Sequence, residues 1–339
     1  MDILSLENIS QEFFLPRKFT DIVTGRPARS IRAVQAMNLA IHENEILGIA
    51  GESGCGKSTT CLIAAGLLSP TDGQVMHRGQ LLADMDDAAR KTFRRSVQII
   101  FQDPYESLNP RFLIGDTVAE GPRAMQLWPE DVIQQKVRSI LTAVGLDPDR
   151  FMNRFPHELS GGERQRVGIA AALVMEPDIV FADEPLSMLD VSIRADILAL
   201  IRTLAAERKF SCVYVSHDLS ILGNVADRIM IMYLGQAVEI GTAKEVLTNP
   251  KHPYTKALIS AVPIPDPTIE RGVPKIVGDL SMPVNTHQGC QFAPRCPYAR
   301  DECWQEFKRL SGAMGSHQSS CLREAEPDVR DEIADAHRG

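Results

Sequence analysis

The stretch that decides the fold is Gly51-Glu-Ser-Gly-Cys-Gly-Lys57-Ser58-Thr59, a glycine-rich loop that ends in a lysine and two hydroxyl residues. The apolar run Ile46 to Ala50 before it predicts a buried strand, and the helix formers in Thr60 to Leu68 predict a helix after it. The phosphate-binding loop pattern requires this strand and helix. Because glycines let backbone N–H groups turn toward phosphate oxygens at a helix start, we expect an ATP site here.

Two side chains of this loop have specific expected roles. Lys57 should reach the β and γ phosphates, and the Ser58 hydroxyl should bind Mg²⁺. The loop residues expected to contact the nucleotide are Gly51, Ser53, Gly54, Cys55, Gly56, Lys57, Ser58 and Thr59.

A pair of acids follows a second apolar run, Ile179 to Ala182. Two acids after a strand more often form a solvated loop, but a phosphate loop upstream favours a catalytic reading. We expect Asp183 to hold Mg²⁺ and Glu184 to polarise the water that attacks the γ phosphate. Asp178, at the other end of the run, has a structural role in this interpretation.

Further strand signals place the loop in an α/β domain. Met37 to Ile41 alternates as a half-buried strand and is followed by a turn at Glu43-Asn44, while Val97 to Phe101 and Cys212 to Ser216 read as central strands. A parallel sheet flanked by helices is therefore the predicted core.

Two segments depart from this strand pattern. Helical patterns dominate from Asp103 to Pro177 and predict a helical subdomain inserted between two core strands. From about Ala261 a separate tail begins, broken by Pro263, Pro265, Pro267, Pro274 and Pro283. Leu15 to Ser30 is expected to form a surface loop.

Composition limits the class of protein. The 339 residues are 44% hydrophobic and 24% charged, as in soluble globular proteins, and no apolar run approaches the roughly 20 residues of a membrane-spanning helix. The net charge of −8 and the absence of a basic stripe disfavour nucleic-acid binding. The start of the chain, Met1-Asp-Ile, lacks the features of a signal peptide, so we expect a cytoplasmic protein.

The string Leu159-Ser160-Gly161-Gly162-Glu163-Arg164-Gln165-Arg166 narrows the family. Alone it would be an ordinary capped helix start. Here it lies between the phosphate loop and Asp183-Glu184, and the order and spacing of these three motifs closely resemble those of ABC transporter ATPases. The resemblance covers about residues 1–260. The resemblance implies a P-loop NTPase core with an antiparallel β subdomain, the helical subdomain at about 103–177, and an ATPase of the translocase class.

The resemblance also implies roles for single residues. Gln102 matches the glutamine that contacts Mg²⁺ and the attacking water, and His217 matches the histidine that touches the γ phosphate. Asp190 resembles the aspartate that crosses a dimer interface. Phe13, or as the second choice Phe14, is similar to the aromatic residue that stacks on adenine.

In this family two ATPase subunits enclose two nucleotides head to tail. Ser160, Gly161 and Gly162 are therefore expected to complete the partner's site. This chain departs from the family at two nearby positions. It has Leu186 where the family usually has threonine or valine, and Met188 where the family usually has alanine. The catalytic residues are intact, so we expect an active subunit with altered communication between sites.

Three strings resemble the oligopeptide, dipeptide and nickel importer branch: Gln102 to Arg111, Met232 to Gly235, and His252-Pro-Tyr-Thr-Lys-Ala-Leu258. They imply a peripheral subunit at the cytoplasmic face of the inner membrane. Its expected partners are a second, usually different, ATPase subunit, two permeases and an extracytoplasmic solute-binding protein. The cargo stays open among peptides, nickel, glutathione and sugars.

The tail, residues 261–339, carries four cysteines: Cys290, Cys296, Cys303 and Cys321. Their spacing fits neither C-x-x-C zinc sites nor ferredoxins and supports only a four-thiolate site of unspecified metal. Because some relatives carry a [4Fe–4S] cluster here, three states stay open: that cluster, zinc with His287 or His317 assisting, and free thiols.

Two rival classes are less favoured. A DNA-repair or translation ATPase would show a long coiled coil, tandem cassettes or basic surface, none of which the sequence contains. A regulatory ABC-like protein that uses ATP as a signal is disfavoured by the intact Glu184 and by the importer strings.

Overall fold

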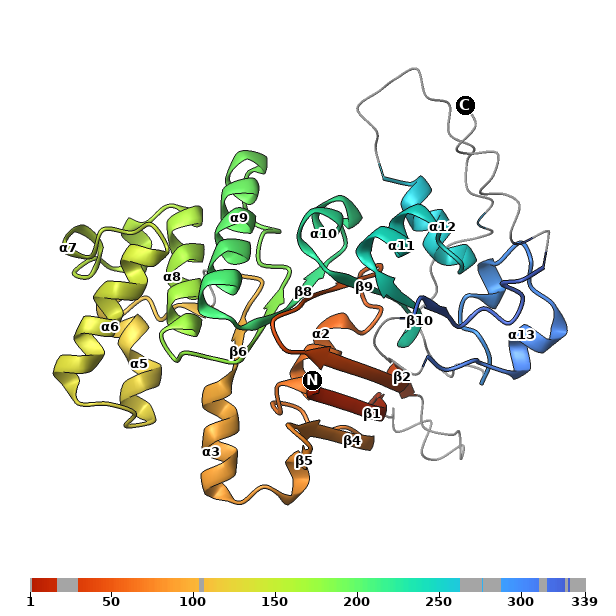
Figure 1. Cartoon of the computed structure of the whole chain (residues 1–339), viewed down its shortest axis with the longest axis horizontal. Coiled ribbons are helices and arrows are strands. Elements are labelled where there is room, and N and C mark those ends of the chain that lie inside the picture. Colours follow the sequence, from red (N-terminus) through yellow and green to blue (C-terminus); the bar gives the residue numbers. More distant parts are fainter. Residues whose placement is uncertain are drawn as a thin grey trace. The chain divides into compact units, whose positions relative to one another are not determined.

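The computed structural model describes residues 2–16, 30–103, 107–262, 276, 288–310, 316–326 and 329. Most of the predicted loop Leu15–Ser30 and the five prolines that begin the tail lie outside these residues, as does His287. The chain divides into two compact units (Figure 1). The first comprises residues 42–46 and 84–215, and the second comprises residues 2–41, 47–83 and 216–339.

The first unit contains three parallel strands in the order β8-β7-β6. They are β6 (Val97–Ile100), β7 (Ile179–Asp183) and β8 (Ser211–Ser216). Short aliphatic runs of this kind are typical of parallel strands covered on both faces, and every residue of β8 is buried. The predicted central strands are confirmed, although β6 ends one residue early and leaves Phe101 half-exposed.

Helices fill the interval between β6 and β7, as the sequence predicted. They are α5 (Ile114–Ala124), α6 (Glu130–Ala143), α7 (Pro148–Phe151), η2 (Pro156–Glu158) and α8 (Gly161–Leu173). The helices α5, α6 and α8 pack on one another (yellow in Figure 1), and α6 buries one apolar stripe formed by Ile133, Val137, Ile140 and Leu141. The unit also contains α3 (Asp87–Ser96) and α9 (Val191–Arg208).

The second unit contains an antiparallel sheet in the order β2-β1-β4-β5. Its strands are β1 (Asp2–Phe14), β2 (Ser30–His42), β4 (Asp72–His77) and β5 (Gln80–Leu81). This confirms the antiparallel β subdomain. The strand expected at Met37–Ile41 is only the end of β2, whose first half buries only Ser30 and Val34 and shows no regular alternation.

A second group of strands in this unit supports the phosphate loop. The order is β11-β10-β9-β3, with β3 (Ile46–Ala50) parallel to β9 (Arg228–Tyr233). Strand β10 (Gln236–Thr242) is antiparallel to β9 and to the tail strand β11 (Gln318–Ser319). Leu234 and Gly235 join β9 to β10 with φ of 40° and 83°, as a two-residue primed hairpin turn requires.

The helices of this unit are short. They are α2 (Lys57–Ala64), η1 (Leu82–Asp84, which straddles the boundary between the units), α10 (Leu219–Val225), α11 (Ala243–Thr248), α12 (Pro253–Ser260), η3 (Ala293–Arg295) and α13 (Asp301–Gln305). Helix α2 begins three residues before the predicted Thr60, so Lys57 and Ser58 lie in its first turn. Within the described ranges, no helix has both the length and the apolar character needed to cross a membrane.

Candidate nucleotide site

The phosphate loop runs from the end of β3 to the start of α2, and neighbouring backbone fixes its shape. A Cβ on Gly51 would overlap the carbonyl oxygen of Met232, and a Cβ on Gly56 would overlap that of Ala33. Gly56 is the residue before α2 and has a φ of 103°, which favours glycine. These two positions therefore require glycine both for space and for backbone conformation.

Lys57 lies at the centre of this loop and is buried. Its Nζ donates hydrogen bonds to the carbonyl oxygens of Gly51 at 2.8 Å and Glu52 at 3.0 Å. Ser53, Gly54 and Ser58 on the rim are exposed. A cationic side chain inside a ring of glycine backbone, at the start of a helix, fits a phosphate group.

Glu184 follows β7 in an unusual backbone conformation. Its φ is 43°, a region that costs non-glycine residues about 1–3 kcal/mol and occurs often at functional sites. Its N–H donates to the carbonyl oxygen of Val215 at 3.1 Å, which fixes it against β8. Asp183, the last residue of β7, pairs with the same Val215. The two acids are thus held at the carboxyl end of the parallel strands.

Gln102 comes two residues after β6, and His217 comes directly after β8. Both side chains are exposed. Since the carboxyl ends of parallel strands lie at one edge of a sheet, Gln102 is at the edge that carries Asp183 and Glu184. Gln102 therefore follows β6 at the edge where β7 presents the two acids, and its contact with Mg²⁺ stays a prediction.

The glycines of the Ser160-Gly-Gly string pack against the start of α9 and the residues just before it. A Cβ on Gly161 would lie 3.4 Å from the Leu189 side chain, and a Cβ on Gly162 would lie 2.9 Å from that of Ile193. Ser160 caps α8 by a reciprocal capping box with Glu163, and its N–H bond to Glu163 lowers the pKa of that carboxyl. The string and the Asp190 segment therefore lie side by side.

Asp190 precedes α9 with its side chain exposed and without a side-chain capping bond. The two unusual residues before it differ in burial: Leu186 is buried, whereas Met188 is 59% exposed. Arg194 donates from Nε to the carbonyl oxygen of Leu189 at 2.8 Å and supports this segment. No sequence pattern predicts this role of Arg194, because its contact is with a backbone atom.

Phe13 and Phe14 end β1 and are 42% and 68% exposed. Both rings are therefore available to a planar ligand, and they belong to the same unit as the phosphate loop. Exposure alone does not decide between them.

The similarity of this chain to known proteins decides its family. It is 45% identical to the oligopeptide transport ATP-binding protein OppF of Salmonella typhimurium over 302 residues, which are 88% of this chain and 90% of that protein. The chain belongs to the ABC transporter family. The family model described as ABC transporter matches residues 34–187, and that of the oligopeptide/dipeptide transporter C-terminal region matches residues 238–303.

Other relatives agree with this family and branch. The dipeptide transport ATP-binding protein DppF of Haemophilus influenzae is 41% identical and is covered to 90%, with 87% of this chain aligned. Among solved structures, the ATP-binding cassette MJ0796, dimeric in a post-hydrolysis state with ADP and Pi, has a TM-score of 0.61 and 28% identity. That similarity covers 71% of this chain and 98% of MJ0796. As an ABC ATPase, the chain binds and hydrolyses ATP with Mg²⁺.

The four tail cysteines of this ABC ATPase lie near one another. The Cys290 N–H donates to the carbonyl oxygen of Cys303 at 2.8 Å. Burial raises the pKa of Cys290 to about 12 and those of Cys296 and Cys321 to about 11, and charge repulsion among the cysteines adds to this. In the described part of the chain, which includes all four cysteines, no three His, Cys, Asp or Glu side chains form a group that could hold a metal ion.

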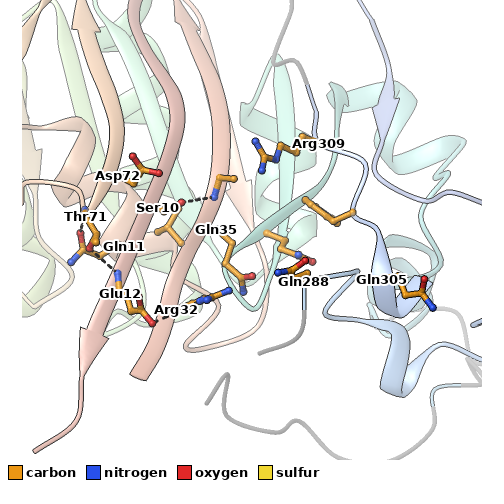
Figure 2. Close-up of a pocket in the computed structure, with 14 residues that line it drawn as sticks. Ser10, Gln11, Glu12, Arg32, Gln35, Thr71, Asp72, Gln288, Gln305 and Arg309 are labelled. Atoms are coloured by element: carbon orange, nitrogen blue, oxygen red, sulfur yellow. Dashed lines mark hydrogen bonds and ion pairs between the residues drawn. The ribbon is translucent and has the colours of Figure 1, made fainter. Parts of the chain in front are cut away.

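A polar cavity of about 590 Å³ lies elsewhere in the second unit of this ABC ATPase. Figure 2 shows residues of the antiparallel sheet on one side and Gln288, Gln305 and Arg309 of the tail on the other. Arg32 and Glu12 form an ion pair of 3.8 Å at its wall. No residue of the phosphate loop lines it, so this cavity is separate from the nucleotide site.

Proposed function

We propose that this ABC ATPase energises the import of peptides across the inner membrane from its cytoplasmic face. The observation that carries the proposal is the match of residues 238–303 to the oligopeptide/dipeptide transporter C-terminal region, beside the ATPase match. Relatives with nearly full coverage are named for oligopeptide and dipeptide transport. The proposed partners are a second ATPase subunit, two permeases and an extracytoplasmic solute-binding protein.

Within this proposal, the loop backbone and Lys57 bind the phosphates of ATP. Ser58, Gln102 and Asp183 supply the oxygen ligands that Mg²⁺ prefers. When bound, Mg²⁺ neutralises charge on the phosphate oxygens. Phe13 stacks on the adenine, which its exposed ring at the end of β1 permits.

Glu184 acts as the base that orients and deprotonates the attacking water, and His217 contacts the γ phosphate. The strained backbone of Glu184, fixed against β8 by its N–H bond, supports its role, because such strain occurs often at functional sites. Asp190 and the Ser160–Gly162 string complete the site of the partner subunit. Ser160 and Asp190 are exposed, and Gly161 packs against Leu189, the residue before Asp190, which supports this assignment.

Exposed aromatic side chains in the helical part of the first unit form the proposed docking surface for the permeases. Phe101, Phe112 and Phe155 are 50%, 39% and 37% exposed. The Ile114 N–H donates to the carbonyl oxygen of Arg154 at 2.9 Å, so the segments that carry Phe112 and Phe155 are adjacent. Apolar rings clustered on a surface are typical anchors of protein interfaces.

Replacing Phe112 and Phe155 together by Asp is expected to weaken binding to the permeases at least about tenfold, since aromatic anchors carry much of an interface's binding energy. Co-purification of the permeases with the tagged chain measures the loss. ATP binding by the isolated variant should stay unchanged. Leu67→Asp, at a residue 62% exposed in the second unit, is the control and should retain the permeases.

We also propose that the four tail cysteines take up a [4Fe–4S] cluster. Three of the thiols accept the backbone N–H two residues later, from Phe292, Tyr298 and Arg323. These donors lower the pKa of each thiol, but they offset only part of the larger increase caused by burial. Binding requires the sulfurs to rearrange, because the described residues form no ready ligand group. Protein purified without oxygen should contain four iron and four acid-labile sulfide per chain, by the definition of the cluster. Colourless, iron-free protein would contradict this, whether zinc or free thiols were found.

The cargo is tested with the chain assembled with its permeases in lipid nanodiscs. We expect the solute-binding protein loaded with oligopeptide or dipeptide to stimulate ATP turnover. Stimulation by nickel, glutathione or sugar in place of peptides would show that the cargo assignment is wrong. ATP turnover unaffected by any permease would favour a regulatory ATPase instead.

A further inference from the structure

The second residue of the phosphate loop, Glu52, is an acid in a loop that binds an anion, and three of its groups are held. Its N–H donates to the Tyr254 Oη at 3.2 Å, and its carbonyl oxygen accepts from the Lys57 Nζ at 3.0 Å. Its two carboxylate oxygens lie 3.3 and 3.4 Å from Nη1 of Arg295. Two of these three partners come from the C-terminal part of the chain.

Arg295 belongs to the cysteine-bearing tail, where it ends η3 directly before Cys296. Its side chain is 14% exposed and that of Glu52 is 28% exposed, so solvent screens their ion pair less than a surface pair. Nη1 also donates to the Tyr233 Oη at 3.3 Å. The tail therefore reaches the phosphate loop through one partly buried guanidinium.

A rigid aromatic cluster supports this contact. The rings of Tyr233, Tyr254 and Phe292 pack with centroid distances of 4.6, 5.3 and 5.4 Å, and each is at most 1% exposed. Tyr233 ends β9, the strand in which Ile231 pairs with Ala50 at the base of the loop. Because the cluster joins β9, which pairs with the loop strand β3, to α12 and the tail, Arg295 has little freedom to move away from Glu52.

An unpaired carboxylate at this position would repel the phosphates of ATP, since like charges a few ångströms apart oppose each other strongly where water is partly excluded. Arg295 neutralises that carboxylate and fixes its direction. We propose that Arg295 is a positioning residue for ATP binding, through which the tail sets the affinity of the phosphate loop. The inference rests on the proposed function, because it takes the loop as the nucleotide site.

The test compares the KM for ATP and kcat of the full chain in the assembled transporter, with equilibrium binding of a fluorescent ATP analogue. Arg295→Ala should raise KM about tenfold and change kcat by less than about twofold, within the range of couplings between contacting charged residues. Arg295→Lys should recover most of the affinity. The double variant with Glu52→Gln and Arg295→Ala should also recover the affinity for ATP, because the loop then has no carboxylate that repels the phosphates.

The matched control is Arg300→Ala, which removes a tail ion pair with Glu326 of 3.0 Å that does not touch the loop, and should leave KM unchanged. If Arg295→Ala does not fold, Arg295→Gln replaces it. Wild-type KM in the Arg295 variant, or no recovery in the double variant, would overturn the inference. Failure of the wild-type chain to bind the analogue would instead refute the proposed nucleotide site.

Discussion

Gly56→Ala is expected to abolish ATP binding, with a dissociation constant raised by more than about 100-fold. The added Cβ would overlap the carbonyl oxygen of Ala33, and the φ of 103° would itself be strained. The surrounding backbone cannot retreat easily, because Gly235 donates to the carbonyl oxygen of Cys55 and accepts from the N–H of Gln35, both at 2.8 Å. The loop must therefore leave its phosphate-binding shape.

The matched control is Gly54→Ala in the same loop. Its φ is 77°, but no atom lies within 4 Å of the added Cβ, so it carries only the backbone strain of about 1–2 kcal/mol, or about tenfold in affinity. Titration with a fluorescent ATP analogue measures both, and thermal unfolding checks that both variants fold. Equal affinities for the two variants would show that the clash at Ala33 does not fix the loop.

Glu184→Gln is expected to lower ATP turnover by about 100-fold to 1,000-fold while ATP binding is retained. Glutamine has the same shape and fits the same backbone, but it cannot accept a proton from the attacking water, a function worth about that factor. Because hydrolysis reopens the paired subunits in this proposal, the variant should also accumulate an ATP-bound pair. Phosphate release and size-exclusion chromatography with ATP measure the two effects.

Glu176→Gln is a close control, because Glu176 also has a positive φ, of 53°, in the same unit. It forms ion pairs with Arg95 and Lys136 at 3.3 and 2.5 Å, so its loss tests electrostatic and folding effects without touching the acids after β7. Turnover near that of the wild type is expected. If Glu184→Gln also kept wild-type turnover, Glu184 would not be the base.

Local patterns explain why much of the fold was predictable. The strands β3, β7 and β8 are short apolar runs with clear ends, and each was placed within one residue. Helix starts were less regular: α2 begins at Lys57, three residues before the predicted Thr60. Helix α8 begins at Gly161, although glycine has a low helix propensity, because Ser160 and Glu163 form a capping box there. Tertiary and capping interactions thus override propensity at such ends.

Contacts between distant residues were not predictable. Arg295 and Glu52 are 243 positions apart, and the packing of Gly161 on Leu189 leaves no periodic signal. The cysteine spacing predicted a four-thiolate site, whereas the described residues, which include all four tail cysteines, form no group that could hold a metal ion. Spacing contains no information on the directions of the sulfurs. For the same reason, the roles of Gln102 and His217 stay predictions from family resemblance.

The most direct measurement of the central claim is uptake of a labelled oligopeptide by cells whose only copy of this chain is wild type or Glu184→Gln. ATP-driven import predicts that deletion of the chain abolishes uptake and that the wild-type chain restores it. Glu184→Gln should not restore it, although the protein is present at the membrane. Peptide uptake at the normal rate in cells without the chain, or with the Glu184→Gln variant alone, would contradict the account.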